Sequence, residues 1–254
     1  MSDPRASLSS QESWWPPPWR VERVTETAST NVDLVAAALA GTAHGAVLVA
    51  DHQTAGRGRL DRHWEAPPGT SLLVSLLLPP PPGGGRLHRL TQAVGLAAIE
   101  ACQAVAGVRP ILTWPNDLYV GDRKLGGILA EAARQDVAII GVVVGLGLNV
   151  NWPDDVPSHL ADRLVSLNRL AGRPIDRDAL LDRLLERLAA RRWDELTADY
   201  RSNLATLGRR VDVTTGERHF VAVAVDVTAE GELVVEHEDG RRESLSAADV
   251  TLLR

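Results

Sequence analysis

The pattern of apolar and polar positions divides the chain into two regions. Apolar residues recur at helical spacing in residues 31–41, 86–107 and 176–204, and the last of these interleaves arginines with acids. Apolar runs bounded by glycine or proline predict strands within residues 45–56, 70–78, 111–120, 124–134 and 136–152. The run at 136–152 is the richest in β-branched residues and is expected at the centre of a sheet. The pattern therefore predicts an α/β domain.

The pattern of apolar and polar residues changes at Gly208. Short alternating segments separated by glycine and charged turns follow and predict a small β-barrel-like domain. The chain opens with a polar segment that becomes rich in Pro and Trp, expected to be a loose arm whose tryptophans dock on the body. A polyproline-II ligand is the alternative for this segment. The predicted organisation is an arm at residues 1–19, a first domain at 20–205 and a second domain at 206–254.

Composition limits the classes of function. The chain has 254 residues, of which 44% are hydrophobic and 24% charged, as in ordinary globular proteins. Its net charge of −6 argues against nucleic acid as the main partner, but leaves room for a local basic pocket. Without a signal peptide or an apolar run near ~20 residues, we expect a cytoplasmic protein without membrane contact. The single cysteine, Cys102, is expected in the core rather than in catalysis.

The richest candidate for ligand binding is DHQTAGRGRLDRHW, residues 51–64. It carries Arg57, Arg59 and Arg62 within six positions. Arginine grips phosphate or carboxylate with two donors, and glycine lets the backbone approach a ligand closely. The segment is neither a Walker loop nor a dinucleotide fingerprint, and such runs are often solvated or nucleic-acid-facing. Its place between two buried-type strands, ending on Trp64, favours an anchored binding loop.

A second candidate is TWPNDLYVGDRKLGG, residues 113–127. Lys124 is the only lysine among the 27 basic residues of the chain. Lysine delivers a compact charge on a thin stem, whereas arginine is a planar fork, so a lone lysine suggests a narrow site. From this count alone, survival by chance is an equal alternative. Asn116 and Asp117 add an amide and a carboxylate suited to Mg²⁺, ribose or phosphate, although Asp117 alone would more often be a turn or cap residue.

Two shorter segments complete the set. TASTN places Ser29, Thr30 and Asn31 before a helix, where helix N-capping is the simpler interpretation. GLGLNV places Asn149 at the end of an apolar strand, where an asparagine is usually a turn residue.

Together these segments resemble the biotin–protein ligase family. The family pattern of Ser-Thr-Asn, Gln-x-x-Gly-Arg-Gly-Arg-x-x-Arg-x-Trp, Trp-Pro-Asn-Asp, Lys-Leu-x-Gly-Ile and Gly-x-Asn occurs in order from Ser29 to Asn149. With the second domain, the resemblance covers residues 20–254. It implies a monofunctional ligase without a DNA-binding domain. The implied fold is an α/β (α+β) catalytic domain related to class II aminoacyl-tRNA synthetases, with a mixed sheet and flanking helices, followed by an SH3-like β-barrel.

The resemblance also implies an activity. Family members activate biotin with ATP and Mg²⁺ to biotinyl-5′-AMP. They then transfer biotin to a lysine of the biotin carboxyl carrier domain of a biotin-dependent carboxylase.

Roles follow for the residues that match the family motifs. Lys124 and Arg59 are implied to be catalytic, with Lys124 between the biotin carboxylate and the α-phosphate. The implied biotin-binding residues are Ser29, Thr30, Asn31, Gln53, Arg57, Gly58, Arg59, Lys124 and Gly127. The implied nucleotide-binding residues are Arg57, Arg59, Arg62, Trp64, Asn116 and Asn149. Asp117 is implied to bind Mg²⁺.

Two positions depart from the family pattern. Thr113 stands where many members carry a basic residue, and Asp61 stands where many carry glycine. These departures bear on nucleotide affinity and on the dynamics of the loop.

Other functions remain open. They are a lipoate or octanoate ligase on the same fold, a non-catalytic biotin-sensing regulator, and an α/β domain whose loop arginines are merely surface. The Gly-Arg-Gly-Arg loop and the second domain favour biotin, and the short first segment and acidic charge disfavour a DNA-binding regulator. We expect no DNA binding, and a monomer or weak homodimer.

Overall fold

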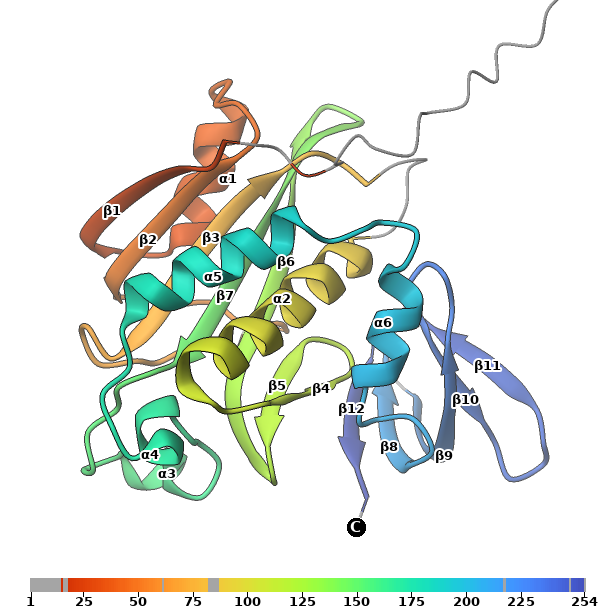
Figure 1. Ribbon diagram of the computed structural model, residues 1–254. Coiled ribbons are helices and arrows are strands. Elements are labelled where there is room, and N and C mark those ends of the chain that lie inside the picture. Colours follow the sequence, from red (N-terminus) through yellow and green to blue (C-terminus); the bar gives the residue numbers. More distant parts are fainter. Residues whose placement is uncertain are drawn as a thin grey trace, which may run out of the picture.

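The computed structural model describes Trp15 and residues 18–60, 62–81, 87–216, 218–246 and 248–253. Within this part of the chain, a large sheet carries helices on its faces, and a smaller sheet built from the C-terminal segment lies beside it (Figure 1). Asp61 and most of the predicted arm at 1–19 lie outside the described residues.

The large sheet is mixed, as the family resemblance implied. Its strand order is β1-β2-β3-β7-β6-β5-β4; β1 runs parallel to β2 and the other neighbours are antiparallel. The β-branched run forms β7 and takes the middle position, as predicted. The strands are β1 (Arg20–Thr27), β2 (Ala46–Gln53), β3 (Ser71–Leu78), β4 (Ile111–Thr113), β5 (Asp117–Val120), β6 (Arg123–Gln135) and β7 (Ala138–Asn149).

Helices cover both faces of this sheet. α2 (His88–Ala106) and α5 (Arg177–Ala189) pack together on one face (Figure 1). Because side chains alternate along a strand, Leu76 and Leu78 of β3 join the core on that face. Leu77 points the other way and packs with α1 (Thr30–Leu39), which covers the opposite face. The N-terminal end of α1 is therefore brought onto this second face of the sheet.

α2 is buried along most of its length, as its small apolar residues predicted. Cys102 lies within it with no exposed surface, and burial raises the pKa of its thiol to about 12. The interpretation of Cys102 as a core residue is therefore confirmed. Across the residues described, no helix is both long enough and apolar enough to cross a membrane.

The prediction of one helix over 176–204 is wrong. The segment forms α5 and then α6 (Leu196–Asn203), with a break between them. The buried guanidinium of Arg191 lies in this break, 2.5 Å from Glu100 and 2.9 Å from Asp199. Tertiary ion pairs thus override a helical pattern that continues in the sequence.

Trp15 docks at the same break. Its indole N–H donates to the carbonyl oxygen of Arg191 at 2.6 Å, and its ring meets Trp193 edge-on with centroids 6.0 Å apart. The guanidinium of Arg89 lies 4.2 Å from the centroid of the Trp193 ring. The expected docking of the tryptophans near the N-terminus is confirmed for Trp15.

The prediction of one strand over 111–120 is also wrong, because the chain reverses between β4 and β5. The turn contains a cis Trp114–Pro115 peptide bond. Trp114 is buried; its backbone N–H donates to Thr206 Oγ1 at 2.9 Å and its indole N–H to the carbonyl of Gly231 at 3.1 Å. The turn is therefore fixed by residues about a hundred positions away in the chain.

The smaller sheet is antiparallel, with strand order β11-β10-β9-β8-β12. Alternate residues such as Val211 and Val213 form its core. Within residues 242–253 the chain forms two strands, β11 and β12. The strands are β8 (Arg210–Thr215), β9 (Arg218–Val227), β10 (Leu233–Glu236), β11 (Arg242–Leu245) and β12 (Asp249–Leu252).

Candidate functional site

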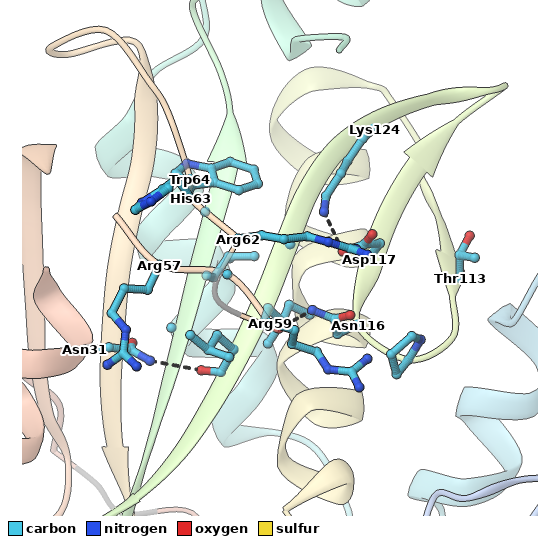
Figure 2. Close-up of a pocket in the computed structure, with 18 of the residues that line it drawn as sticks. Asn31, Arg57, Arg59, Arg62, His63, Trp64, Thr113, Asn116, Asp117 and Lys124 are labelled. Carbon is cyan, nitrogen blue, oxygen red and sulfur yellow. Dashed lines mark hydrogen bonds and ion pairs between the residues drawn. The ribbon is translucent and has the colours of Figure 1, made fainter. Parts of the chain in front are cut away.

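A cavity opens on the α1 face of the large sheet, where the start of α1 meets the arginine loop (Figure 2). Its volume is about 180 Å³, and it is open to solvent at its mouth. Asp249 and Val250 of β12 also line it, so both sheets contribute. The predicted residues that line it are Ser29, Thr30, Asn31, Gln53, Arg57, Gly58, Arg59, Arg62, Trp64, Asn116, Asp117, Lys124 and Gly127.

One end of the cavity, which we call the polar end, is built from Thr30, Asn31, Gln53 and Ser75. The backbone N–H and the hydroxyl of Thr30 donate to Gln53 Oε1 at 2.8 and 3.0 Å. Because an N–H only donates, Gln53 must turn its oxygen toward Thr30, which leaves its NH₂ group for other partners. The hydroxyl of Ser75 lies 2.7 Å from Thr30 Oγ1 and 2.6 Å from Asn31 Oδ1. Ser29 precedes α1 but its side chain makes no capping hydrogen bond.

Glu131 on β6 also belongs to this end, although the sequence motifs did not include it. Its Oε2 accepts from Asn31 Nδ2 at 2.8 Å, and its Oε1 lies 2.9 Å from Arg57 Nη1. Asn31 Nδ2 also donates to the carbonyl of Leu129 at 3.2 Å. Figure 2 shows Arg57 and Asn31 together at the polar end. Period-two spacing from Gly127 along β6 is the sequence signal that could have pointed to Glu131.

Two glycines on β7 let side chains lie flat on the sheet. A Cβ at Gly145 would stand 2.2 Å from Asn31 Oδ1, and one at Gly147 would stand 2.5 Å from the Trp64 indole. The predicted site residues include Gly127 but not these two glycines. The alternation Gly-Leu-Gly-Leu-Asn, which places both glycines on one face, was the available signal.

The arginine loop folds back on itself as a short hairpin. The backbone N–H of Gly58 donates to the carbonyl of Arg62 at 2.7 Å, and that of Trp64 donates to Gly56 at 2.9 Å. A Cβ at Gly56 would lie 2.4 Å from the carbonyl oxygen of Trp64, so only glycine fits this crossing. The prediction of an anchored loop is confirmed.

Two loop arginines reach the second sheet. Arg62 forms an ion pair with Asp249. Arg59 Nη2 lies 3.4 Å from the carbonyl oxygen of Ala248. Burial lowers the pKa of Arg59, while Asp249 and Asp117 act in the opposite direction. Partial removal from water strengthens the attraction between this guanidinium and any anion in the cavity.

Lys124 lies at the other end, which we call the lysine end. Its ammonium is 2.7 Å from Asp117 Oδ1 and 5.8 Å from the centroid of the Trp64 ring (Figure 2). Its backbone is held on both sides, since its N–H donates to Arg163 at 2.7 Å and its carbonyl accepts from Val165 at 3.0 Å. This clasp comes from the segment between α3 (Ser158–Ala161) and α4 (Leu167–Ala171).

Two predicted asparagines lie differently. Asn116 is on the cavity wall, where its Nδ2 donates to the carbonyl of Ile128 at 2.7 Å. Asn149 is buried behind Lys124, with its Nδ2 3.4 Å from the Lys124 carbonyl, and does not line the cavity. Its predicted contact with a nucleotide therefore stays a prediction, and the contact observed is with the backbone of Lys124.

The cavity has an excess of positive charge in an acidic chain. Among the described residues, four cationic side chains and two carboxylates line it; they are Arg57, Arg59, Arg62, Lys124, Asp117 and Asp249. This is the local basic pocket that the net charge of −6 left open. Its chemistry suits an anionic ligand with a neutral polar head.

Models of two protein families match the chain. The model of the biotin/lipoate A/B protein ligase family matches residues 21–149, and that of the biotin protein ligase C-terminal domain matches residues 206–253. The chain belongs to the biotin protein ligase family.

Individual relatives of this biotin protein ligase family member support the same assignment. The biotin–[acetyl-CoA-carboxylase] ligase of Mycobacterium tuberculosis is 37% identical, over 93% of this chain and 90% of that protein. A bifunctional ligase/repressor of Bacillus subtilis is 31% identical, over 80% of this chain and 65% of that protein. The solved Aquifex aeolicus biotin protein ligase in complex with biotin and ATP is 28% identical, with a TM-score of 0.77 over 92% of this chain and 98% of that one.

The Mg²⁺ site that the family resemblance implied at Asp117 has little support from this chain's own side chains. Asp117 Oδ1 is buried and its near partner is the ammonium of Lys124. Among the described residues, no three His, Cys, Asp or Glu side chains gather in a way that could hold a metal ion. A single carboxylate that is already paired does not form a metal cage, so the residues present do not fit a magnesium site built by the protein alone.

Further cavity residues were not predicted for a role. Thr113, the family departure, is buried on β4 and presents a small neutral group to the cavity. Tyr119 also lines the cavity, and burial, followed by the nearby Asp117, raises its pKa. Asp249 lines the cavity from the second domain, and Ser75 lies behind Thr30 on a buried strand; no motif marks either residue.

Proposed function

We propose that this chain activates biotin with ATP to biotinyl-5′-AMP, with release of diphosphate, and transfers biotin to a lysine of a biotin carboxyl carrier domain. The acceptor belongs to a biotin-dependent carboxylase, consistent with the name of the relative from Mycobacterium tuberculosis. The observation that carries the proposal is the arrangement of the cavity: uncharged Thr30 and Gln53 at the polar end, Lys124 at the other, and two arginines that reach the second sheet.

The polar end suits the ureido ring of biotin. Gln53 has a free NH₂ group to donate to the ureido carbonyl, because its oxygen is taken by Thr30. The oxygen of the Thr30 hydroxyl has a lone pair to accept a ureido N–H. An unpaired polar group in such a site would cost about 1–3 kcal/mol, so a ligand without the ring, such as lipoate, binds less well.

The lysine end suits the reacting anions. The biotin carboxylate must attack the α-phosphate, and two like charges ~4 Å apart repel by about 4 kcal/mol at an effective dielectric near 20. The ammonium of Lys124, held by its clasped backbone, would stand between them and stabilise the charge that develops in the transition state. Asp117 holds the ammonium in place before ligands bind.

The loop arginines would then protect the product. Arg59 is partly buried and close to Asp249 of the second domain, and Arg62 is paired with the same carboxylate. In this proposal Arg59 stays over the adenylate and excludes water from the mixed anhydride. In this proposal Mg²⁺ would enter with ATP as part of the substrate rather than on a site built by the protein's own side chains.

Further parts of the proposal concern architecture. We infer that the catalytic domain at 20–205 is related to class II aminoacyl-tRNA synthetases, and that the domain at 206–254 is an SH3-like barrel. The antiparallel five-stranded sheet and the match at 206–253 support the second inference. We also propose that the enzyme is cytoplasmic, is a monomer or weak homodimer, and does not bind DNA. Sedimentation tests the oligomeric state, and a gel shift tests DNA binding.

The direct test uses purified protein, ATP, Mg²⁺ and a biotin carboxyl carrier domain. We expect biotin-dependent exchange of diphosphate into ATP, and transfer of biotin onto one lysine of the carrier. Lipoate and octanoate serve as competing substrates in parallel reactions. Exchange that depends on lipoate rather than biotin would refute the proposal in favour of the related ligase, and biotin binding without exchange would indicate a sensor.

A further inference from the structure

A single carboxylate on β6 contacts both the arginine loop and α1, in addition to the Thr30–Gln53 contact at the base of the loop. One oxygen of Glu131 lies 2.9 Å from Arg57 of the arginine loop, and the other accepts from Asn31 of α1 at 2.8 Å. Glu131 itself does not line the cavity. Whatever it does for a ligand must therefore pass through these two partners.

The contact with Asn31 fixes the polar end. Asn31 is buried, and its NH₂ group points at two acceptors, Glu131 and the carbonyl of Leu129. Its oxygen is thereby directed at the hydroxyl of Ser75, which in turn lies beside Thr30. The orientation of the Asn31 amide thus reaches the residue proposed to meet the ureido ring.

The contact with Arg57 fixes the loop. The Glu131 side chain is 24% exposed and that of Arg57 is 48% exposed, so this ion pair is only partly screened by water. Arg57 pairs through its backbone with His63 across the loop hairpin. Pinning the Arg57 guanidinium therefore holds the first strand of that hairpin against β6.

We infer that Glu131 is a positioning residue that couples closure of the arginine loop to the state of the biotin-ring pocket. This inference rests on the proposed function for the identity of the ligand. The coupling itself is a property of the three side chains. Loss of the Glu131 charge loosens the loop and the ring pocket together, and leaves Lys124 undisturbed at the far end.

The test compares Glu131→Gln, Arg57→Gln and the double variant, with Glu186→Gln as control. Glu186 forms an ion pair with Arg183 at 2.7 Å on α5, on the other face of the sheet. Limited trypsin digestion without ligand, with cleavage after Arg59 followed by mass spectrometry, reports opening of the loop. Rapid dilution of the enzyme–biotinyl-5′-AMP complex reports retention of the adenylate, and diphosphate exchange at saturating biotin reports chemistry.

For Glu131→Gln we expect cleavage after Arg59 and release of the adenylate each to rise about threefold to tenfold, the effect of losing one half-buried charged contact. The KM for biotin should rise by a similar factor. The kcat should stay within about twofold, because Lys124 at the far end of the cavity keeps its contacts. The double variant should release the adenylate no faster than the more impaired of the two single variants. Glu186→Gln should behave as the wild type, and melting temperatures should match throughout.

Two results would overturn the inference. They are additive effects of the Arg57 and Glu131 substitutions on adenylate release, and loop cleavage that is unchanged in Glu131→Gln. Failure of the proposed function is distinguishable, because the wild type would then form no biotinyl-5′-AMP while the ligand-free digestion still measures the coupling.

Discussion

Replacement of Lys124 by arginine is the sharpest perturbation of the proposed site, because it keeps the charge and changes its shape. The ammonium lies between Asp117 at 2.7 Å and the Trp64 ring at 5.8 Å. A Cβ added at Gly127 would lie 3.4 Å from Lys124 Nζ, so the backbone of β6 packs closely against the ammonium. A planar guanidinium with donors on three nitrogens does not fit the space of one tetrahedral ammonium.

The magnitude follows from what the charge is proposed to do. A cation misplaced from a position ~4 Å from an anion forfeits up to about 4 kcal/mol at an effective dielectric near 20. Loss of one preorganised donor at a developing charge typically slows a reaction by about 10²–10³, or ~2.7–4 kcal/mol. We therefore expect Lys124→Arg to lower kcat for adenylation by about 100-fold to 1000-fold. Folding stability should change by less than about 1 kcal/mol, because the side chain is partly exposed and keeps its charge.

The assay is biotin-dependent exchange of diphosphate into ATP, with thermal melts on the same preparations. Lys124→Met removes the charge at similar length and should lose at least as much activity. Arg183→Lys makes the reverse exchange on the exposed face of α5 and should leave activity unchanged. Exchange within about threefold of wild type in Lys124→Arg, equivalent to ~0.7 kcal/mol, would refute the role given to the ammonium.

Three further outcomes are expected. Gly147→Ala places a Cβ about where the Trp64 indole lies, at 2.5 Å, so we expect a several-fold rise in KM for both substrates; unchanged KM values would contradict the packing argument. Cys102, with its pKa raised to about 12, should resist Ellman's reagent at pH 8 in the native protein and react only on unfolding. The pKa of Glu243 is lowered to about 2, chiefly by Arg218, so its stabilising effect is present above the unfolded pKa and lost as pH falls toward 2. Glu243→Gln should therefore lower stability at pH 7 by less than ~1 kcal/mol, since its arginine partners Arg218 and Arg241 are exposed and water screens the pairs, and pH-dependent melts should converge with wild type near pH 2.

Local patterns were enough to predict elements whose environment is uniform along their length. The run that forms β7 is buried on both faces over several residues, so continuous β-branched sequence identifies both the strand and its central place. The break near Arg191 and the turn at Trp114 were not predictable in this way. Each is stabilised by partners distant in sequence, Glu100 in one case and Thr206 and Gly231 in the other, and local periodicity carries no information about them.

The same division applies inside the site. Motif residues such as Gln53 and Lys124 stand in chemically unusual sequence, where arginines, glycines and a unique lysine draw attention to them. Ser75 and Glu131 stand in ordinary strands, and their importance arises only when β3, β6 and α1 come together on one face of the sheet. A serine in an apolar run suggests only an interruption of the strand pattern, and a glutamate in a half-exposed strand suggests a solvent-exposed side chain. Sequence pattern therefore identifies groups that act on a ligand more readily than groups that orient them, because orientation depends on neighbours that only the fold supplies.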